Sequence, residues 1–326
     1  MKIVIPGGTG HLGTILTSAF RRRGDDVVVL SRNVEAPARR WDGRTLGDWA
    51  EEIDGADVVI NLAGRSVDCR YGAKQREEIL RSRVDSTRVV GEAIARAKRP
   101  PLVWLQASTA TIYAHRYDAP NDERTGIIGG DEPDAPEDWH FSIDVARAWE
   151  RALDDARTPC TRKVKMRMAM VMGAAPGGAF HALLRHIRLG FGRFGDGRQY
   201  MSWIHERDFV RAVRWLIDND VDGAVNLAAP EPLPCETFLR ELREAWGSSA
   251  ISTLAIPASG FVLEIGAMLA RTEPELVLKS RRVMPGRLME HNFVFDFTTW
   301  HDAARDLCAR WRGGVAVVEP QSMPLY

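Results

Sequence analysis

The sequence has few cysteines, no excess of charge of either sign and no long apolar run. Its four cysteines lie far apart and without metal-ligand spacing: Cys69, Cys160, Cys235 and Cys308. A disulfide framework is unexpected in a chain of 326 residues, so we predict reduced cysteines and no metal centre. The 44 basic and 44 acidic side chains cancel, which argues against a nucleic-acid partner.

We expect no segment in this sequence that directs the protein into or across a membrane. No run of about 18 apolar residues is present, so we expect no membrane partner. The first residues form an apolar strand pattern instead of a basic, apolar and small-residue leader. We therefore expect a cytoplasmic protein. A hydrophobic content of 45% and a charged content of 27% are ordinary for a globular chain with a sizeable core.

The chain does contain a strand, a glycine-rich turn and a helix at its start. Residues 3–5 are an unbroken β-branched run, and apolar residues then recur at helical spacing. Between them stand glycines at every third position, which suit a tight turn and a close approach of backbone to a pyrophosphate. The predicted cofactor-binding residues here are Gly7, Gly10, His11, Leu12 and Gly13. The alternative is an ordinary glycine-rich turn that binds nothing.

The residues after the second apolar strand, 26–30, indicate which dinucleotide binds. An acidic residue at this point would accept hydrogen bonds from the ribose of NAD. The chain has Ser31 and Arg32 instead, and a hydroxyl and a guanidinium suit a 2′-phosphate. We therefore favour NADP(H) over NAD(H). The alternative is that Arg32 is only a solvated loop residue.

A third apolar strand ends in small residues, which leave room for a ligand at the edge of a parallel sheet. These residues are Leu62, Ala63 and Gly64, and we assign them to the cofactor site. Asp57, at the start of the same strand, is a candidate acceptor for an adenine amino group. It is equally well explained as a residue of the turn that enters the strand.

The remaining pattern alternates strands and helices and then becomes irregular. It predicts a doubly wound α/β Rossmann sheet over residues 1–172, completed by parts of 200–230, and a smaller, mostly helical substrate or cap domain over 173–326. The predicted helices and strands of the rest of the chain are 73–97, 102–113, 142–157, 163–171, 180–189, 206–218, 224–228, 236–246, 260–270, 293–297 and 299–310. Residues 114–140 have the composition of a long surface loop.

Three side chains near the end of the strand 102–113 are candidates for catalysis. The hydroxyls of Ser108 and Thr109 belong at the carboxyl edge of the sheet and can hold a substrate carbonyl. Backbone capping explains them equally well. Tyr113 is a further candidate, but an unassisted phenol has a pKa of about 10 and is a weak acid at neutral pH. A packing role with a solvated tip is the simpler explanation for Tyr113.

The chain resembles the extended short-chain dehydrogenase/reductase superfamily, and within it the atypical NAD-dependent epimerase/dehydratase-like subfamily with a C-terminal domain of unknown function. The resemblance covers nearly the whole chain and places that terminal domain at about 247–326. The motifs that carry it are Gly7–Gly13, Asn61–Gly64, Ser82–Thr87, Trp149–Glu150, Gly195–Gln199, Ser202–Asp208 and Met284–Leu288. It implies that Ser108 and Thr109 match the catalytic hydroxyl region, and that relatives often dimerise, so a homodimer is a further expectation.

One departure from the superfamily bears directly on the chemistry. Its enzymes carry Tyr-x-x-x-Lys on the helix before Glu150, where the lysine lowers the pKa of the tyrosine. This chain has Ser142 and Ala146 at those positions, and no tyrosine in it is followed by lysine four residues later. The subfamily commonly lacks the pair as well. His140 and Asp144, at the start of the same helix, are substitute acid–base candidates or simply polar helix-start residues.

The subfamily signature also contributes to the predicted substrate pocket, which we assign to His140, Trp203 and His205. For His205 a buried structural role is equally plausible. Two functions follow. The chain is an NADP(H)-dependent oxidoreductase or epimerase acting on a small molecule, with Ser108 or Thr109 polarising a carbonyl. Alternatively it is a redox sensor that binds NADPH without turnover, which the missing Tyr-x-x-x-Lys pair favours.

Overall fold

The computed structural model describes residues 1–32, 38–132, 135–247 and 273–314. The helices and strands, in chain order, are β1 (Lys2–Pro6), α1 (His11–Arg22), β2 (Asp26–Ser31), β3 (Arg39–Arg40), η1 (Asp48–Glu52), β4 (Val58–Asn61), α2 (Ala73–Arg96), β5 (Val103–Thr109), η2 (Ala110–Ile112), η3 (Glu137–Trp139), α3 (His140–Asp154), β6 (Arg162–Met168), β7 (Met170–Met172), α4 (Ala179–Arg188), β8 (Tyr200–Met201), β9 (Trp203–His205), α5 (Glu206–Asp218), β10 (Gly223–Leu227), β11 (Leu233–Pro234), α6 (Cys235–Trp246), α8 (Glu275–Leu278), α9 (Gly286–Glu290) and α10 (Trp300–Arg312).

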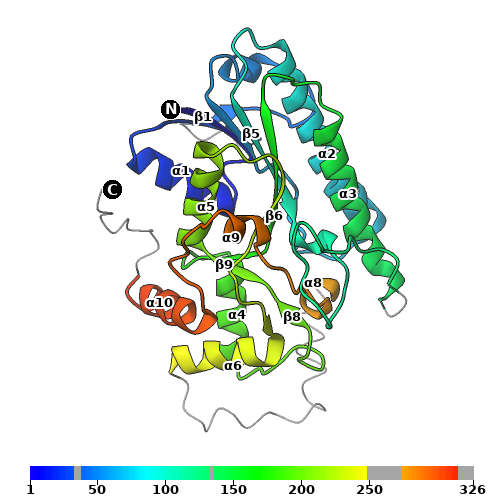
Figure 1. Cartoon of the computed structure of the whole chain (residues 1–326), viewed down its shortest axis with the longest axis vertical. Coiled ribbons are helices and arrows are strands. Elements are labelled where there is room, and N and C mark those ends of the chain that lie inside the picture. Colours follow the sequence, from blue (N-terminus) through cyan, green and yellow to red (C-terminus); the bar gives the residue numbers. More distant parts are fainter. Residues whose placement is uncertain (33–37, 133–134, 248–272, 315–326) are drawn as a thin grey trace.

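The centre of the molecule is a seven-stranded sheet in the order β10-β6-β5-β4-β1-β2-β3, with every neighbouring pair parallel. Helices α1 and α5 cover one face and α2 and α3 cover the other (Figure 1). Apolar side chains of β1 point alternately to the two faces of the sheet, so both faces must be covered by helices. Ile3 and Ile5 pack with α1 and α5, whereas Val4 packs with α2. The predicted doubly wound Rossmann fold is therefore confirmed.

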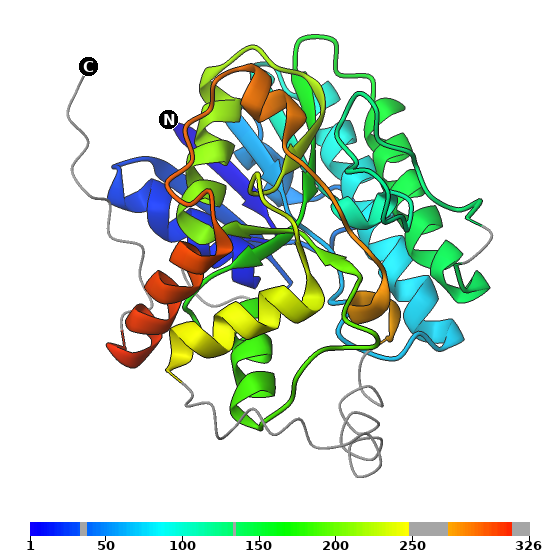
Figure 2. The ribbon, with the colours of Figure 1, turned by 60° about the horizontal axis from the view of Figure 1, so that its bottom comes forward.

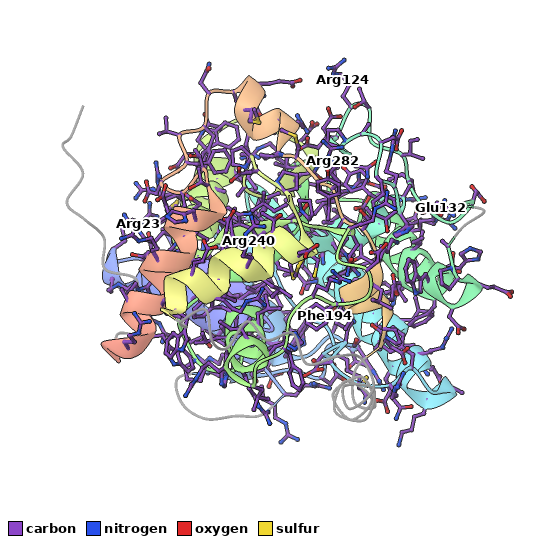
Figure 3. The ribbon with its side chains drawn as sticks, turned by 90° about the horizontal axis from the view of Figure 1, so that it is seen from below. Arg23, Arg124, Glu132, Phe194, Arg240 and Arg282 are labelled. Carbon is purple, nitrogen blue, oxygen red and sulfur yellow. The ribbon has the colours of Figure 1, made fainter. Side chains whose placement is uncertain are left out.

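A smaller lobe, mostly helical, lies beyond the carboxyl ends of the strands (Figure 2). Its core is shared by α4, α6 and α10, and Figure 3 shows α6 and α10 side by side. Phe194, from the loop between α4 and β8, and Trp300, from α10, are buried in this core. The mostly helical C-terminal region is as predicted, while the exact domain boundaries stay a prediction.

Two predicted elements differ from the structure. The segment 293–297 was expected to be a strand because apolar residues alternate, but it has no strand partner among the described residues. Its alternation instead reflects packing, since Phe293 and Phe295 lie against the main core and Phe297 against the smaller one. The strand expected over 163–171 is divided into β6 and β7. The helix expected over 260–270 lies outside the described residues.

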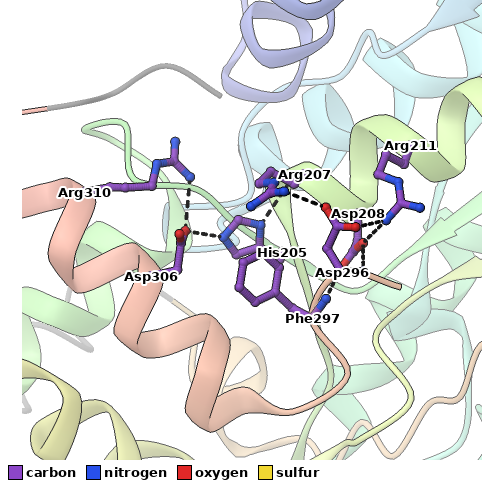
Figure 4. Close-up of polar contacts among 8 residues, drawn as sticks. All are labelled: His205, Arg207, Asp208, Arg211, Asp296, Phe297, Asp306 and Arg310. Atoms are coloured by element: carbon purple, nitrogen blue, oxygen red, sulfur yellow. Dashed lines mark hydrogen bonds and ion pairs between the residues drawn. The ribbon is translucent and has the colours of Figure 1, made fainter. Parts of the chain in front are cut away.

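The same segment is held to α5 by a buried carboxylate. Asp208 accepts hydrogen bonds from the backbone N–H groups of Asp296, at 2.7 Å, and Phe297, at 2.9 Å (Figure 4). Its side chain is 1% exposed, and Arg211 lies 3.4 Å away. Burial raises the pKa of Asp208, although the two N–H donors oppose that rise. The carboxylate therefore joins the C-terminal segment to the Rossmann core.

We expect Asp208→Ala to lower the free energy of unfolding by about 2–3 kcal/mol, because it leaves two backbone donors of Asp296 and Phe297 without their charged acceptor. Urea unfolding followed by circular dichroism measures the change. Asp218→Ala is the matched control, since Asp218 lies half exposed at the end of the same helix beside Arg214 and should cost less than about 0.5 kcal/mol. Equal losses for the two variants would contradict this role of Asp208.

Candidate functional site

The carboxyl ends of β1, β2 and β4 open onto a groove of about 680 Å³. Parallel strands present their loops at one edge, so segments far apart in the sequence meet there. The groove is lined by Gly7, Thr9, Gly10, Ser31, Arg32, Arg40, Trp41, Asp42, Gly43, Arg44, Leu62, Ala63, Gly64, Arg65, Ser82 and Ser86. Most of the predicted cofactor-binding residues line this groove, and Gly13 lies in the glycine turn beneath it. The side chains of His11 and Leu12 are the two exceptions.

The glycine turn brings β1 close to the end of β4. Gly7 has φ +78°, and a Cβ atom there would lie 2.8 Å from the Ala63 backbone. A Cβ at Gly13 would lie 2.5 Å from Gly8, so α1 packs directly on the turn. At Gly10 the space is open, because a Cβ would meet only the Gly7 carbonyl oxygen at 3.5 Å. The turn is thus closed towards the protein and open towards the groove.

The start of α1 offers its backbone amides to this turn. Within the described residues, the first turn of α1 carries no acidic side chain and Gly10 provides no side-chain cap. An uncapped helix start has free N–H groups and partial positive charge, which suit a diphosphate. The Nε2 atom of His11 is buried and has no hydrogen-bond partner among the described residues, and it faces Gly178. The groove therefore fits the phosphates of a dinucleotide.

Of the two exceptions, His11 faces Gly178 and not the groove, and the Leu12 side chain packs against the main core. Their contribution to a cofactor would therefore come from the backbone at the start of α1. Ala63, by contrast, lies in the groove, and its N–H donates to the Asn61 side chain at 3.1 Å. The Asn61 amide in turn donates to Gln106 at 3.0 Å, which fixes the end of β4.

The groove is basic at the end of β2. Arg32 and Arg40 line it together with Arg44, while the Ser31 hydroxyl lies 3.0 Å from that of Thr9. Asp42 is the one acidic residue in the lining, and its carboxylate accepts bonds from the backbone and hydroxyl of the following turn. Arg40 and Arg44 were not predicted from the sequence, because β3 is only two residues long and carries no hydrophobic pattern.

Asp57 requires a correction. Its carboxylate accepts a hydrogen bond from the backbone N–H of Lys2 at 2.7 Å, at the amino ends of β1 and β4. The glycine turn lies at the opposite ends of these strands, so Asp57 does not reach the groove. It closes the strand entry, which was the alternative interpretation.

A small cavity of about 110 Å³ lies beside the groove. It is lined by Val67, Tyr71, Ile79, Arg83, Thr109, Thr111, Phe141, Ser142, Val145, Trp149 and Leu276. The Arg83 guanidinium separates the two, because a Cβ at Gly64 would lie 3.3 Å from it. It packs over the Trp149 ring and donates to the carbonyl oxygens of Arg65 and Ile79.

Two of the three catalytic candidates belong to a buried network instead of this cavity. Ser108 donates to the Glu150 carboxylate at 2.6 Å, and Glu150 is also paired with Arg167. The Tyr113 hydroxyl donates to Asn226 at 2.9 Å and accepts from Arg167 at 3.0 Å. Tyr113 is only 2% exposed, and burial raises the pKa of its phenol. Ser108 and Tyr113 therefore lie in a buried network and their catalytic role stays a prediction, whereas the solvated tip expected for Tyr113 is wrong.

Thr109, the third candidate, does line the cavity. Its hydroxyl oxygen accepts a bond from the backbone N–H of Thr111 at 3.1 Å and so caps η2. The sequence suggested either a position at the carboxyl edge of the sheet or a capping role for this hydroxyl, and Thr109 has both. Because the capping bond uses an acceptor lone pair, the hydroxyl proton of Thr109 is left to donate to a substrate oxygen.

The predicted substrate-pocket residues His140, Trp203 and His205 do not line the small cavity that the described residues form. Trp203 is fully buried, donates to the Glu231 carbonyl oxygen and packs against Trp300. His205 caps α5 through Nδ1, lies 3.0 Å from Asp306 on α10 through Nε2, and stacks on Phe297 (Figure 4). His140 begins α3 but is not in the cavity wall. The signature thus serves the docking of the C-terminal segment.

Tyr71, in the cavity wall, and Glu275, next to it, were not predicted from the sequence. Ser142, at the position of the superfamily tyrosine, lines the cavity together with Tyr71 and donates to the Glu275 carboxylate. Tyr71 belongs to the loop before α2, and Glu275 begins α8 more than a hundred residues after Ser142. No spacing in the sequence links three such segments.

A larger depression, of about 1150 Å³, lies at the other edge of the sheet, at the amino ends of β5, β6 and β10. It lacks a glycine turn and is a shallow surface between Asp154 and Gly223. Ligands of open parallel sheets bind at the carboxyl edge, so the groove and the small cavity are the better candidate site. The described residues contain no cluster of metal ligands, and no described helix could span a membrane.

Comparison with known proteins agrees with this geometry. Residues 3–228 match the NAD dependent epimerase/dehydratase family, and residues 258–307 match a Domain of unknown function (DUF1731). The epimerase family protein SDR39U1 of Bos taurus is 30% identical over 317 residues, which cover 95% of this chain and 100% of that protein.

Solved structures give the same result. The crystal structure of human epimerase family protein SDR39U1 (isoform2) with NADPH has a TM-score of 0.81 at 27% identity, covering 95% of this chain and 99% of that one. A nucleoside-diphosphate sugar epimerase from Corynebacterium glutamicum has a TM-score of 0.73 at 25% identity, covering 98% of this chain and 62% of that one. The chain belongs to the NAD dependent epimerase/dehydratase family.

Proposed function

We propose that the chain binds NADP(H) in the groove and acts as an oxidoreductase or epimerase on a small molecule that enters the adjoining cavity. The observation that carries this proposal is the basic end of β2. Arg32, Arg40 and Arg44 line the groove where the adenosine ribose belongs, and the carboxylate of Asp42, the acidic residue of the lining, is occupied by its own turn. Guanidinium groups favour a 2′-phosphate at this point. The human relative whose structure contains NADPH supports the same preference.

Different residues of the chain would bind different parts of the cofactor. The free amides at the start of α1 and the turn at Gly7 and Gly10 would hold the diphosphate, and Ser31 with Arg32 the ribose phosphate. The nicotinamide, when bound, supplies or accepts a hydride. A donor such as Thr109, in the adjoining cavity, would orient the oxygen of the substrate.

The alternative function is a sensor that binds NADPH without turnover, and the absence of Tyr-x-x-x-Lys favours it. A cytoplasmic location and a homodimer also stay predictions.

Both functions require binding of NADPH. Titration of the purified chain with NADPH and with NADH, followed by fluorescence, tests this requirement. We expect submicromolar binding of NADPH and weaker binding of NADH. No binding of either nucleotide would remove both functions, and binding without turnover of any carbonyl would favour the sensor.

A further inference from the structure

Arg83, on α2, is a charged side chain without a carboxylate partner in the part of the chain that the structure describes. By contrast, the exposed Arg81, two residues earlier on the same helix, pairs with Glu77. Arg83 is partly buried and lines the small cavity. The groove lies just beyond it, because a Cβ atom at Gly64 would lie 3.3 Å from the Cζ atom of Arg83. A positive charge thus stands at the boundary between the groove and the cavity.

The guanidinium of Arg83 keeps one edge for a ligand. Its Nη1 atom donates to the carbonyl oxygens of Arg65, at 3.1 Å, and Ile79, at 3.0 Å, whereas Nη2 and Nε have no acceptor within the described ranges. These two atoms form an edge of the planar fork that matches both oxygens of a carboxylate. Burial lowers the pKa of Arg83 to about 10, so the group stays charged at neutral pH. A partly buried charge is costly unless a ligand supplies a counter-ion.

Residues of two sequence motifs hold this guanidinium in place. It packs over the Trp149 ring, 5.0 Å from the centroid, where α2 and α3 run side by side (Figure 1). The Trp149 indole donates to the Thr87 hydroxyl at 3.1 Å, and that hydroxyl donates to the backbone carbonyl of Arg83 at 2.8 Å. The Ser82 hydroxyl accepts from the backbone N–H of Arg65 at 2.9 Å and so fixes a carbonyl that Arg83 contacts. The two motifs therefore position one side chain.

Two hydroxyls in the cavity wall are also left as donors. The Thr109 oxygen accepts from the backbone N–H of Thr111 at 3.1 Å. The Thr111 oxygen in turn accepts from Nε of Arg281 at 3.0 Å. Because each oxygen already accepts a hydrogen bond, each hydroxyl proton is left for an acceptor in the cavity. Together with Arg83, these side chains suit a ligand that is rich in acceptor oxygens.

The anionic groups of the cofactor have places of their own in the proposed function. The start of α1 suits the diphosphate and Arg32 the 2′-phosphate, and Arg83 is not in the groove lining as the structure describes it. Glu275, which accepts from Ser142 of the cavity wall, pairs with Lys279 at 3.8 Å, and their side chains are 3% and 1% exposed. The free edge of Arg83 is therefore left for the substrate.

We propose that Arg83 binds a carboxylate of the substrate through Nη2 and Nε, while the hydroxyls of Thr109 and Thr111 donate to a neighbouring oxygen. This inference rests on the proposed function and narrows its substrate. A volume of about 110 Å³ holds only a few heavy atoms, so the carboxylate and the second oxygen belong on adjacent carbons. Phe141 and Leu276, in the apolar part of the wall, suit a short alkyl flank. The substrate class is thus a small 2-oxo acid, or the corresponding 2-hydroxy acid in the direction of oxidation.

Binding of oxamate and oxamide to the NADPH complex of the full-length protein tests this assignment. Oxamate is an unreactive analogue of a 2-oxo acid, and oxamide has nearly the same shape without the charge. The fluorescence of the bound NADPH follows both titrations. We expect oxamate to bind about 30-fold more tightly than oxamide, because a carboxylate forms charge-assisted hydrogen bonds with the guanidinium.

Three variants assign the preference for oxamate to one side chain. Arg83→Gln should lower the affinity for oxamate to that for oxamide, with the affinities for oxamide and NADPH unchanged. Arg83→Lys should restore part of the preference, because it keeps the charge but loses the fork. Arg81→Gln is the matched control and should bind both ligands as the wild type does, since Arg81 is exposed on the same helix.

The wild-type comparison needs no variant, so it decides the matter even if Arg83→Gln does not fold. Equal affinities of the wild type for oxamate and oxamide, or no binding of oxamate, would overturn the inference. An unchanged preference in a folded Arg83→Gln would do the same. Parallel losses of NADPH and NADH in that variant would assign the guanidinium to the cofactor diphosphate and also overturn it. Failure of the wild type to bind NADPH would instead remove the proposed function.

Discussion

Replacing Arg32 by glutamate should weaken NADPH binding about 100-fold, equivalent to about 2.7 kcal/mol, while NADH binding changes less than about threefold. Arg32 follows β2 directly and lines the groove beside Ser31. A guanidinium attracts a 2′-phosphate through charge-assisted hydrogen bonds, and a carboxylate at the same place repels it. NADH lacks that phosphate, so it provides the reference within each variant. The difference should shrink at high salt, because Arg32 is exposed and screened.

Arg40 is a second arginine of the groove, and its neighbour Arg39 provides a matched control. Arg40 lines the groove, whereas Arg39 points away and pairs with Glu52 at 3.0 Å. Arg40→Glu should therefore reproduce part of the NADPH loss, and Arg39→Glu should leave both nucleotides nearly unaffected. Fluorescence titration of each variant measures these affinities. Equal losses of NADPH and NADH in Arg32→Glu would remove the argument for the 2′-phosphate, and a loss in Arg39→Glu would indicate only a general effect of charge.

The parts of the site that the sequence predicted are those encoded locally. A glycine turn between an apolar strand and an amphipathic helix is contained in a dozen residues, and the residue after β2 is fixed by the strand that precedes it. Gly7, Arg32 and Gly64 therefore lie in the groove as expected. The fold was predictable for the same reason, since burial on both sides of a strand is visible as an unbroken β-branched run.

The parts that the sequence did not predict depend on contacts between distant segments. Tyr71 and Ser142 line one cavity and Ser142 donates to Glu275, and no periodicity marks such a meeting. Neighbouring residues of a strand point to opposite faces of the sheet, so Ser108 and Thr109 cannot both face the cavity. The sequence pattern did not indicate which of the two does. His205 looked like a pocket residue because its motif is specific, but a motif can equally specify a docking contact.

Breaking the buried ion pair between α3 and β6 should have the largest effect on stability. We expect Glu150→Ala to lower the free energy of unfolding by about 3–5 kcal/mol, because it leaves the Arg167 charge buried and unpaired. Arg167 contacts both carboxylate oxygens of Glu150 at 2.8 Å, and both side chains are about a tenth exposed. Urea unfolding measures the loss. The exposed pair of Arg88 and Glu92 on α2 provides the control, and Glu92→Ala should cost less than about 0.5 kcal/mol.

The pH dependence of the same pair gives a second test. Burial raises the pKa of Glu150, but the bonds and charge of Arg167 outweigh it, so the pKa lies below its ordinary value. A folded-state pKa below that of the unfolded chain adds stability above the unfolded value, and this stability is lost as the pH falls through the folded value. Wild type should therefore approach Glu150→Ala in stability only in acid, below about pH 4.

The double variant Glu150→Leu, Arg167→Met distinguishes the destabilisation caused by one unpaired buried charge from the net contribution of the intact ion pair to the free energy of unfolding. If the loss in Glu150→Ala comes from an uncompensated charge, removing both charges should restore most of the stability, since two buried ions cost several kcal/mol of desolvation. If stability stays low, the network through Ser108 and Tyr113 would itself be required. NADPH affinity should be unchanged in either variant, because none of these four residues lines the groove. A selective loss of NADPH binding would return Ser108 and Tyr113 to the candidate site.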